Sequence, residues 1–455
     1  MSNNLFDDFN EVSAKQWKQK IQYELQGEDY NALLWQTNES ILVKPFYHAE
    51  DLKNLPQPQN TKATKWKIGQ TIYVADTKIS NKNALFAIKN GVESLAFIIP
   101  SETVSIENLL KGINLETIEI HFKPLFLSHT FLEKYPQKKN IFIHNDIIGN
   151  LGKSGNWFQN SKHDINTFKK IYSVTNTLSV DAALYQNAGA NIVQQLAYSL
   201  AHANEYLNIL NEDGLLTTKT EVVFQFAIDS NYFFEIAKLR AIRLLWKSLA
   251  PTYNLSTNCE IIVLPTLRNK TIYENYNNLL RTTTECMSGI LGGANTVFNI
   301  PYNTVTKNNN AFNERIARNQ LLILKHESHF NTVNNPVDGS YYIETITNQL
   351  AEKALNLFKD IEKSGGFLKQ LKLGTIQRKI KASSNKTEQQ LENNETILVG
   401  VNAHKYPVKD IGKNIQKYPF ISLKPRLTKI ESIIEKRVSE NLERKRLYKK
   451  FKNEN

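Results

Sequence analysis

Cysteine is scarce in this 455-residue chain, and long apolar runs are missing. The two cysteines, Cys259 and Cys286, are too few for a disulfide framework or a four-cysteine zinc site, which favours a reducing compartment. No segment has the roughly 20 consecutive apolar residues of a membrane helix. The polar, acidic start, MSNNLFDDFN, does not have the pattern of a secretory signal. Together these absences predict a cytoplasmic protein that does not enter membranes.

Motifs for nucleotides and metals are also absent. Glycine is sparse and GxGxxG does not occur, which weakens a dinucleotide-binding reading. Gly152-Lys153-Ser154 fails as a phosphate loop, because Ile147 stands where the loop needs its first glycine. His326 and His329 lie one helical turn apart, but HExxH and a third ligand are missing. We therefore expect a surface histidine pair and no metal site.

The net charge of +12 is concentrated at the C-terminal end. Residues 424–455 carry six more basic than acidic residues, which is half of the total. A basic tail can contact phosphates, but Glu431, Glu435 and Glu440 are interleaved with the cations. This mixture predicts a charged surface helix rather than a nucleic-acid-binding segment.

Strand-like and helical patterns alternate from about residue 70 onward. Apolar runs typical of strands occur at Ser94–Ile99, Thr117–His121, Asn140–His144, Ile171–Leu178, Glu221–Ile228, Glu260–Leu264 and Asn295–Ile300. The clearest helical patterns are Asn191–Leu210, Tyr232–Leu249 and Tyr273–Leu291. Repeated βα units over this length predict an α/β fold, a (β/α)₈ TIM-type barrel at residues 70–380. A doubly wound open sheet is the alternative.

The flanking segments are expected to be smaller. Residues 1–69 read as an extended N-terminal arm and linker, 381–396 as a polar linker, and 397–455 as a short strand followed by a basic helical tail. The arm is too short to bury its own aromatic residues, so they need a surface to lie on. The candidates for a partner interface are Phe6, Phe9, Trp17, Tyr30 and Trp35.

Five segments resemble the methylmalonyl-CoA mutase family in sequence, order and spacing. They are FFEIAKLRAIRLLW (233–246), RTTTECMSGILGG (281–293), Arg315–Thr347 with its NNPVDGS loop, DIEKSGGF (360–367) and ILVGVN (397–402). The opening arm is similar to that of the family's small (beta) subunit. This resemblance implies a heterodimer with a homologous large (alpha) catalytic subunit, which terminal segments embrace.

The chain departs from the catalytic pattern of that family. The family's catalytic subunits carry a tyrosine and a histidine shortly before a Gln-x-Ala-Gly-Ala sequence. Aligned through Gln186 and Gly189, these positions are Ala183 and Leu184. Methyl and isobutyl groups can neither donate a proton nor polarise a carbonyl. A second family segment with His and Gln corresponds to the aliphatic EIIVLPTLR at 260–268. We therefore expect no catalytic residue in this chain.

The resemblance also bears on the cofactor. The family's cobalamin domain ligates cobalt through Asp-x-His-x-x-Gly, and after Asn402 this sequence has only His404, without that motif. We expect a shortened form without the cobalamin-binding domain, with adenosylcobalamin held by the partner and no cofactor or metal bound here. The expected function is that of a non-catalytic small subunit, with a barrel filled by apolar residues.

Two alternatives remain open. The first is a free-standing barrel protein that binds CoA thioesters without mutase activity. The second is a homomeric enzyme with relocated catalytic residues, for which His144, Asn145 or Asp146 would be candidates.

Overall fold

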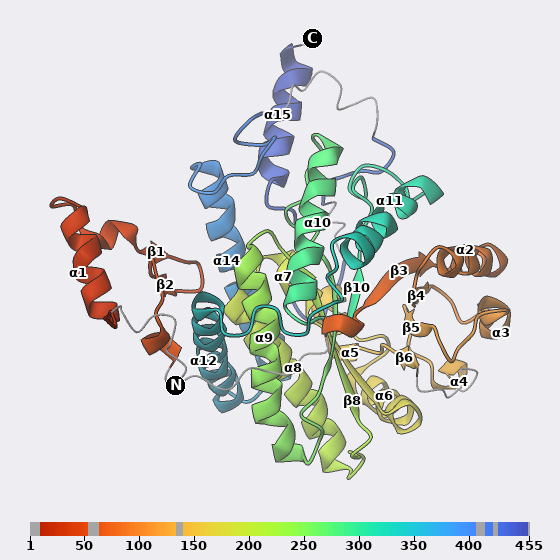
Figure 1. Ribbon diagram of the computed structural model, residues 1–455. Coiled ribbons are helices and arrows are strands. Elements are labelled where there is room, and N and C mark those ends of the chain that lie inside the picture. Colours follow the sequence, from red (N-terminus) through yellow and green to blue (C-terminus); the bar gives the residue numbers. More distant parts are fainter. Residues whose placement is uncertain (1–9, 53–62, 133–139, 406–414, 422–425, 454–455) are drawn as a thin grey trace, which may run out of the picture.

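The computed structural model describes residues 10–52, 63–132, 140–405, 415–421 and 426–453. Its centre is a barrel of eight parallel strands, each followed by helical structure on the outside (Figure 1). The strands lie in the order β6-β5-β4-β3-β10-β9-β8-β7, so each strand pairs with its neighbours in sequence except that no ladder joins β6 to β7 among the described residues, and β10 returns to β3. They are β3 (Lys67–Tyr73), β4 (Ser94–Ile99), β5 (Glu119–Pro124), β6 (Ile141–Ile143), β7 (Thr177–Asp181), β8 (Glu221–Ile228), β9 (Glu260–Pro265) and β10 (Thr296–Phe298). This arrangement confirms the predicted TIM-type barrel and rules out the open sheet.

Helices surround the strands. They are α2 (Thr77–Lys89), α3 (Ile106–Leu110), α4 (His129–Leu132), α5 (Ile147–Ser154), α6 (Ser161–Thr175), α7 (Ala183–Ala188), α8 (Ile192–Glu212), α9 (Tyr232–Leu249), α10 (Asn275–Leu291), α11 (Ala311–Leu322), α12 (Tyr341–Lys363), α13 (Phe367–Lys372), α14 (Thr375–Glu392) and α15 (Glu440–Asn453). Of the helices placed by the structure, none is long and apolar enough to cross a lipid bilayer.

Three expected segments have a different structure. Ile171–Leu178 is not one strand, because α6 continues to Thr175 and Asn176 ends it in the left-handed region at φ 51°. The predicted linker 381–396 is helical as far as Glu392, since α14 buries one side of its polar sequence, including Ile380 and Leu391. The predicted strand 397–402 is reduced to an isolated bridge between Val399 and Ala403.

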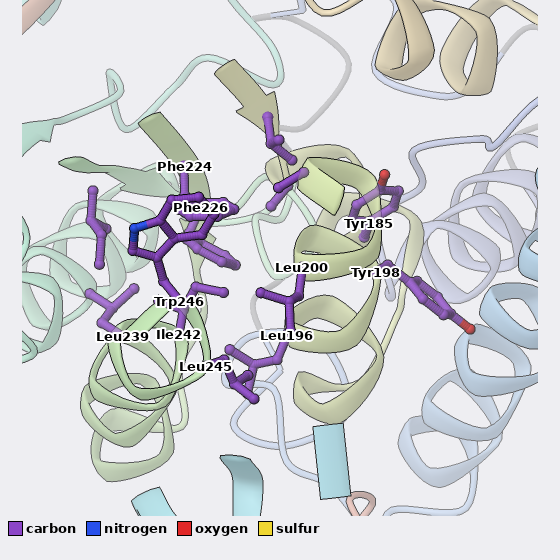
Figure 2. Packing of buried hydrophobic residues seen from close by; sticks show 14 of the residues in the cluster. Tyr185, Leu196, Tyr198, Leu200, Phe224, Phe226, Leu239, Ile242, Leu245 and Trp246 are labelled. Carbon is purple, nitrogen blue, oxygen red and sulfur yellow. The ribbon is translucent and has the colours of Figure 1, made fainter. Parts of the chain in front are cut away.

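The main core lies between β8 and the helices that cover it. Phe224 and Phe226 of β8 point outward to Trp246 and Leu239 of α9, while Leu196 and Leu200 of α8 approach from the side (Figure 2). All of these side chains are buried. The alternate residues of β8 face the barrel interior instead, as the period of two in a strand requires.

Two of the family-like segments contact each other through Arg240 of α9. Its guanidinium donates to Asp338 in the NNPVDGS loop and, over 2.6 Å, to Glu344 near the start of α12. The same Glu344 carboxylate accepts the backbone N–H of Gly339, which has φ 79°. Because this buried cation holds both the loop and the following helix, the segments are structural parts of the fold.

The N-terminal arm has two differently packed parts. Its helix α1 (Ala14–Glu24) has no buried residue and lies apart from the barrel (Figure 1). Trp17, 46% exposed, stacks on Phe46 within the arm at a centroid distance of 4.8 Å. The two-stranded hairpin β1 (Trp35–Gln36) and β2 (Leu42–Val43) instead reaches the body of the protein, where Trp35 contacts Phe234 edge to face.

Of the five aromatic residues proposed for the interface, the structure describes three. Tyr30 is buried, whereas Trp17 and Trp35 are about half exposed. Phe6 and Phe9 lie outside the described residues.

Candidate functional site at the barrel mouth

The carboxyl ends of β7, β8 and β9 open onto a cavity of about 290 Å³. Active sites of TIM barrels lie at this end of the strands, so it is the first place to look for function. Gln186 follows β7, Asp229 follows β8, and Arg268 and Asn269 follow β9. The hairpin turn of the arm forms another wall through Glu39. The cavity is therefore built from both the barrel and the arm.

Ala183 and Leu184 lie in α7, directly after β7, and are 7% and 3% exposed. One Leu184 methyl group lies close to Gly152 of α5, whose other near neighbours are Ile433 from the C-terminal region and Leu371 of α13. The two positions aligned with the family's tyrosine and histidine are thus both buried, and Leu184 belongs to the apolar core. Neither residue lines the cavity.

Gly189 shows why the end of α7 needs glycine. It has φ 100°, and a Cβ atom there would lie 2.7 Å from Cβ of Ser384 and 2.8 Å from Cζ of Arg268. The close approach lets Arg268 fill the space between α7 and α14, where it donates to Ser384 and Thr387. Sequence reasoning used Gly189 only as an alignment anchor.

A buried polar network lies behind the cavity. Asp229 accepts hydrogen bonds from Gln186 and Asn269, both at 2.8 Å. Asn269 also donates to Glu285, which is paired with Lys270 at 2.7 Å. These side chains are from the ends of three strands and from α10. The network extends further, because Gln195 donates to Gln186 and the backbone N–H of Ser230 donates to Asp229.

Two carboxyl groups in this region have perturbed acidity. Burial raises the pKa of Glu235 to about 7, although Lys238 lies 2.5 Å away. Burial likewise raises the pKa of Glu285 to about 7 against the opposing effect of Lys270. A carboxyl group with such a pKa can transfer protons near neutrality, but each of these is held by a buried lysine, as in a structural ion pair.

A segment from the C-terminal region crosses the mouth. We call residues 429–443 the C-terminal strap. Its backbone N–H groups donate to the carbonyl oxygens of Gly155 from Lys429, Gly152 from Ile433, Asn187 from Lys436 and Arg268 from Val438, over 2.8–3.0 Å. The strap includes the first turn of α15, and the residues before this helix are packed against the barrel. Ile433, Arg437 and Glu443 are all buried.

The barrel interior is filled by side chains, though not only by apolar ones as expected. An apolar layer consists of Ala96, Phe142, Val223, Ile262 and Phe298. Beside it runs a chain of hydrogen bonds between strands. Glu119 contacts His121 Nε2 at 2.8 Å, His121 Nδ1 contacts His144 Nε2 at 2.9 Å, and His144 Nδ1 contacts Ser179 Oγ at 2.7 Å.

A lysine lies at each end of this series of hydrogen bonds. Lys67 lies 2.5 Å from Glu119, and Lys123 donates over 2.5 Å to Gln225, which in turn donates to Ser179. Burial would raise the pKa of Glu119, but the His121 and Lys67 contacts lower it to about 2. Burial lowers the pKa of His121, and that of His144 falls well below its usual value. At neutral pH the interior thus holds an ionised Glu119 and two neutral imidazoles.

This series of hydrogen bonds inside the barrel does not support a relocated catalytic site. Ser179, His144 and Glu119 lie in a hydrogen-bonded series that superficially resembles a hydrolase triad. A second cavity, of about 480 Å³, lies between α14 and the C-terminal strap. None of the three residues lines either this cavity or the mouth cavity. Asp146 caps α5 at Gly149 and accepts from Tyr206, so its carboxylate is also engaged in the fold.

The remaining candidate residues are the histidine pair and the two cysteines. His326 and His329 are exposed, as expected. Within the described ranges, no group of three or more His, Cys, Asp and Glu residues could hold a metal ion. Both cysteines are buried, and burial raises the pKa of Cys259 to about 11. A thiol in that state is a poor nucleophile.

Comparison with known proteins gives a consistent relationship. The family model described as methylmalonyl-CoA mutase matches residues 136–449. The chain is 32% identical to the methylmalonyl-CoA mutase small subunit of Porphyromonas gingivalis, over 88% of this chain and 70% of that protein. It is 29% identical to the small subunit of Streptomyces virginiae, over 76% of this chain and 59% of the relative.

A large subunit also matches. The methylmalonyl-CoA mutase large subunit of Streptomyces virginiae is 26% identical, over 86% of this chain and 62% of that protein. The chain thus spans between 59% and 70% of the lengths of these relatives. The matched residues include the barrel strands from β6 onward, the mouth and the C-terminal strap. This chain belongs to the methylmalonyl-CoA mutase family.

Proposed function

We propose that this chain is the non-catalytic small subunit of a heterodimeric, adenosylcobalamin-dependent methylmalonyl-CoA mutase. The holoenzyme would interconvert methylmalonyl-CoA and succinyl-CoA, with the chemistry on a homologous large subunit. The observation that carries the proposal is the burial of the side chains of Ala183 and Leu184 directly after β7, at the barrel mouth. The family's reaction needs a proton donor at this place, and neither side chain can supply one.

Two further features support a non-catalytic role for this chain: side chains fill the barrel interior, and the C-terminal strap crosses the mouth. The C-terminal strap occupies space above β7 and β9 through backbone bonds to Asn187 and Arg268. Inside, Lys123 and Gln225 join β5 to β8 across the barrel axis. These contacts occupy part of the space at the mouth and along the axis that a long substrate would need.

The residues present do not fit adenosylcobalamin. Tyr185 and Leu184 are buried in α7, and the mouth above them is crossed by the C-terminal strap, including Ile433. The nine histidines of the sequence do not include one in Asp-x-His-x-x-Gly. In our proposal the partner holds the cofactor, and no step of the reaction involves this chain's side chains.

The arm supplies a surface for the partner. Helix α1 buries none of its residues against its own chain, and Trp17 and Tyr23 are exposed on it. Exposed aromatic residues on an isolated helix are typical anchors of an interface. We propose that α1 lies on the large subunit, whereas Tyr30 and Trp35 mainly attach the arm to this chain.

Co-expression with a candidate large subunit tests the proposal. We expect a 1:1 complex in size-exclusion chromatography, with mutase turnover in the complex and none in this chain alone. Trp17→Ala should weaken the complex about tenfold or more while leaving the free energy of unfolding within about 0.5 kcal/mol. Phe312→Ala is the matched control, since Phe312 is also exposed (58%, against 46% for Trp17) but lies on α11, away from the arm (Figure 1). Turnover by the isolated chain would refute the proposal.

A free-standing CoA-thioester-binding protein is the second candidate. The mouth cavity of about 290 Å³ is the observation in its favour. Isothermal titration calorimetry of the isolated chain with methylmalonyl-CoA distinguishes the two. Micromolar binding without any partner would favour the second candidate, whereas our proposal expects no measurable heat.

A further inference from the structure

The barrel is not closed by backbone hydrogen bonds at every strand pair. Among the described residues, ladders join each neighbouring pair from β6 round to β7, but none joins β6 to β7 themselves. We call this place the β6–β7 seam. Two side-chain hydrogen bonds cross it. His144, directly after β6, contacts Ser179 of β7, and Asp146 accepts the backbone N–H of Asp181 at 2.8 Å.

The charge on Glu119 sets the direction of the hydrogen-bond chain that ends at this seam. An ionised carboxylate only accepts, so His121 must carry its proton on Nε2. His121 Nδ1 is then an acceptor, and His144 must donate to it from Nε2. His144 Nδ1 in turn accepts from the Ser179 hydroxyl. The seam bond therefore depends on both imidazoles being neutral and in the same tautomer.

We propose that the His121–His144–Ser179 chain is a proton-sensitive clasp that closes the barrel, and that protonating the histidine pair loosens the β6–β7 seam. A barrel with seven backbone ladders and one side-chain seam has its weakest closure there. Local opening is expected where backbone pairing is least. The inference concerns the fold of this chain and does not depend on the proposed subunit role.

Protonation of His121 or His144 disrupts the hydrogen bonds that join His121, His144 and Ser179. A proton on His121 Nδ1 sets two N–H groups against each other unless His144 moves its own proton from Nε2 to Nδ1. In that case His144 donates to Ser179, and the Ser179 hydroxyl hydrogen loses its acceptor. A second proton removes the remaining acceptor and places two cations 2.9 Å apart. Each proton therefore costs a buried hydrogen bond or adds repulsion.

The charges around the pair add to this cost. Lys67 and Lys123 approach from β3 and β5, while Glu119 opposes them. Beyond these, Asp181 on β7 lies near Lys123, Glu260 on β9 lies near Glu119, and Asp146 lies across the seam. Burial lowers the pKa of both histidines below 6.5, so the folded state binds fewer protons than the unfolded chain as the pH falls below that value. The closed seam is accordingly favoured at neutral pH and lost on acidification.

Hydrogen exchange measured by mass spectrometry at pH 7.5 and 5.5 tests the clasp in the full chain, after correction for intrinsic rates. Peptides covering 141–146 and 177–182 should lose protection by about tenfold or more, which corresponds to about one pKa unit of proton linkage. Peptides covering 221–228 and 260–265 should change much less. Equal changes in all strands, or none at the seam, would overturn the proposal.

Non-titrating variants separate the clasp from general acid effects. His121→Gln/His144→Gln should remove the difference between the seam peptides and the others. His326→Gln is the matched control, because His326 is exposed, and it should keep the wild-type response. A seam response that persists in the double variant would overturn the assignment to these histidines.

The tautomers give an independent test if the double variant does not fold. In the wild-type chain with ¹⁵N-labelled histidine, nuclear magnetic resonance should show His121 and His144 as Nε2–H tautomers at pH 7.5. Single substitutions assign the two signals. A Nδ1–H tautomer or a charged ring at that pH would contradict the direction of the chain.

Discussion

Nη1 of Arg268 donates a hydrogen bond to the carbonyl oxygen of Lys436, 2.9 Å away, and so connects the end of β9 to the C-terminal strap. The backbone of the same arginine accepts from Val438. Arg268→Met keeps the length of the side chain but removes its donors. We expect faster proteolysis within residues 429–443 and a loss of about 1–3 kcal/mol in the free energy of unfolding. Arg378→Met on α14, where the arginine is exposed, should change neither quantity.

Arg240 should be a strong determinant of stability. Arg240→Met leaves the Asp338 and Glu344 carboxylates without their shared cation, and we expect a loss of about 3 kcal/mol in chemical denaturation. The exposed Lys20–Glu24 pair on α1 is a fitting comparison, and Lys20→Met should cost less than about 0.5 kcal/mol. Partial recovery in the Arg240→Met/Asp338→Asn/Glu344→Gln variant would show that the loss comes from unpaired carboxylates. Similar losses in the two single variants would contradict this account of α9.

Gly189→Ala combines backbone strain with a steric clash. The new Cβ would meet Ser384 and Arg268 at under 3 Å, in addition to the cost of a φ of 100°. Gly214 has φ 64°, and a Cβ atom added there would meet nothing within 4 Å. Gly214→Ala therefore measures the cost of a positive φ without a steric clash. We expect Gly189→Ala to be about 1–3 kcal/mol more destabilising than Gly214→Ala in thermal unfolding. Equal effects would mean that α7 and α14 can separate without cost.

Glu285 predicts a pH dependence of stability in a defined window. Because its pKa is raised to about 7, the folded state holds a proton that the unfolded chain releases near 4.5. The folded state therefore binds more protons between these values, and this group's contribution to stability falls as the pH rises through the window. We compare the free energy of unfolding in urea between pH 5 and 8. The value for wild type minus that for Glu285→Gln should decrease as the pH rises. Glu327 is exposed, so the free energy of unfolding of Glu327→Gln should change with pH as that of wild type does. If the difference between wild type and Glu285→Gln increased with pH, the predicted direction would be wrong.

The barrel was predictable because its patterns are long and regular. Glu221–Ile228 and Tyr232–Leu249 were expected with the bounds that β8 and α9 have. The boundary between α6 and β7 was missed, since it depends on Asn176 adopting a positive φ, which the apolar pattern does not indicate. The first strand, β3, was also missed, because Lys67, Gln70 and Thr71 interrupt its apolar residues.

The interior was harder to foresee than the fold. Glu119, His121 and Lys123 alternate along β5, a period of two that would have placed all three on one face of the strand. Their partners are single residues on other strands, such as Ser179 and Gln225, which carry no signal alone. The C-terminal strap was missed because several of its contacts are backbone hydrogen bonds, which do not depend on residue type. Its ion pairs, such as that of Lys436 with Glu388, join residues far apart in the sequence.

Whether catalysis resides outside this chain is tested most directly by succinyl-CoA formation in a reconstituted heterodimer. One preparation pairs wild-type large subunit with this chain, and another carries Ala and Leu in place of the large subunit's tyrosine and histidine. A third pairs wild-type large subunit with a His144→Gln variant of this chain, and size-exclusion chromatography confirms that each complex forms. Our account predicts turnover in the first and third complexes and none in the second. Turnover in the second complex would contradict it.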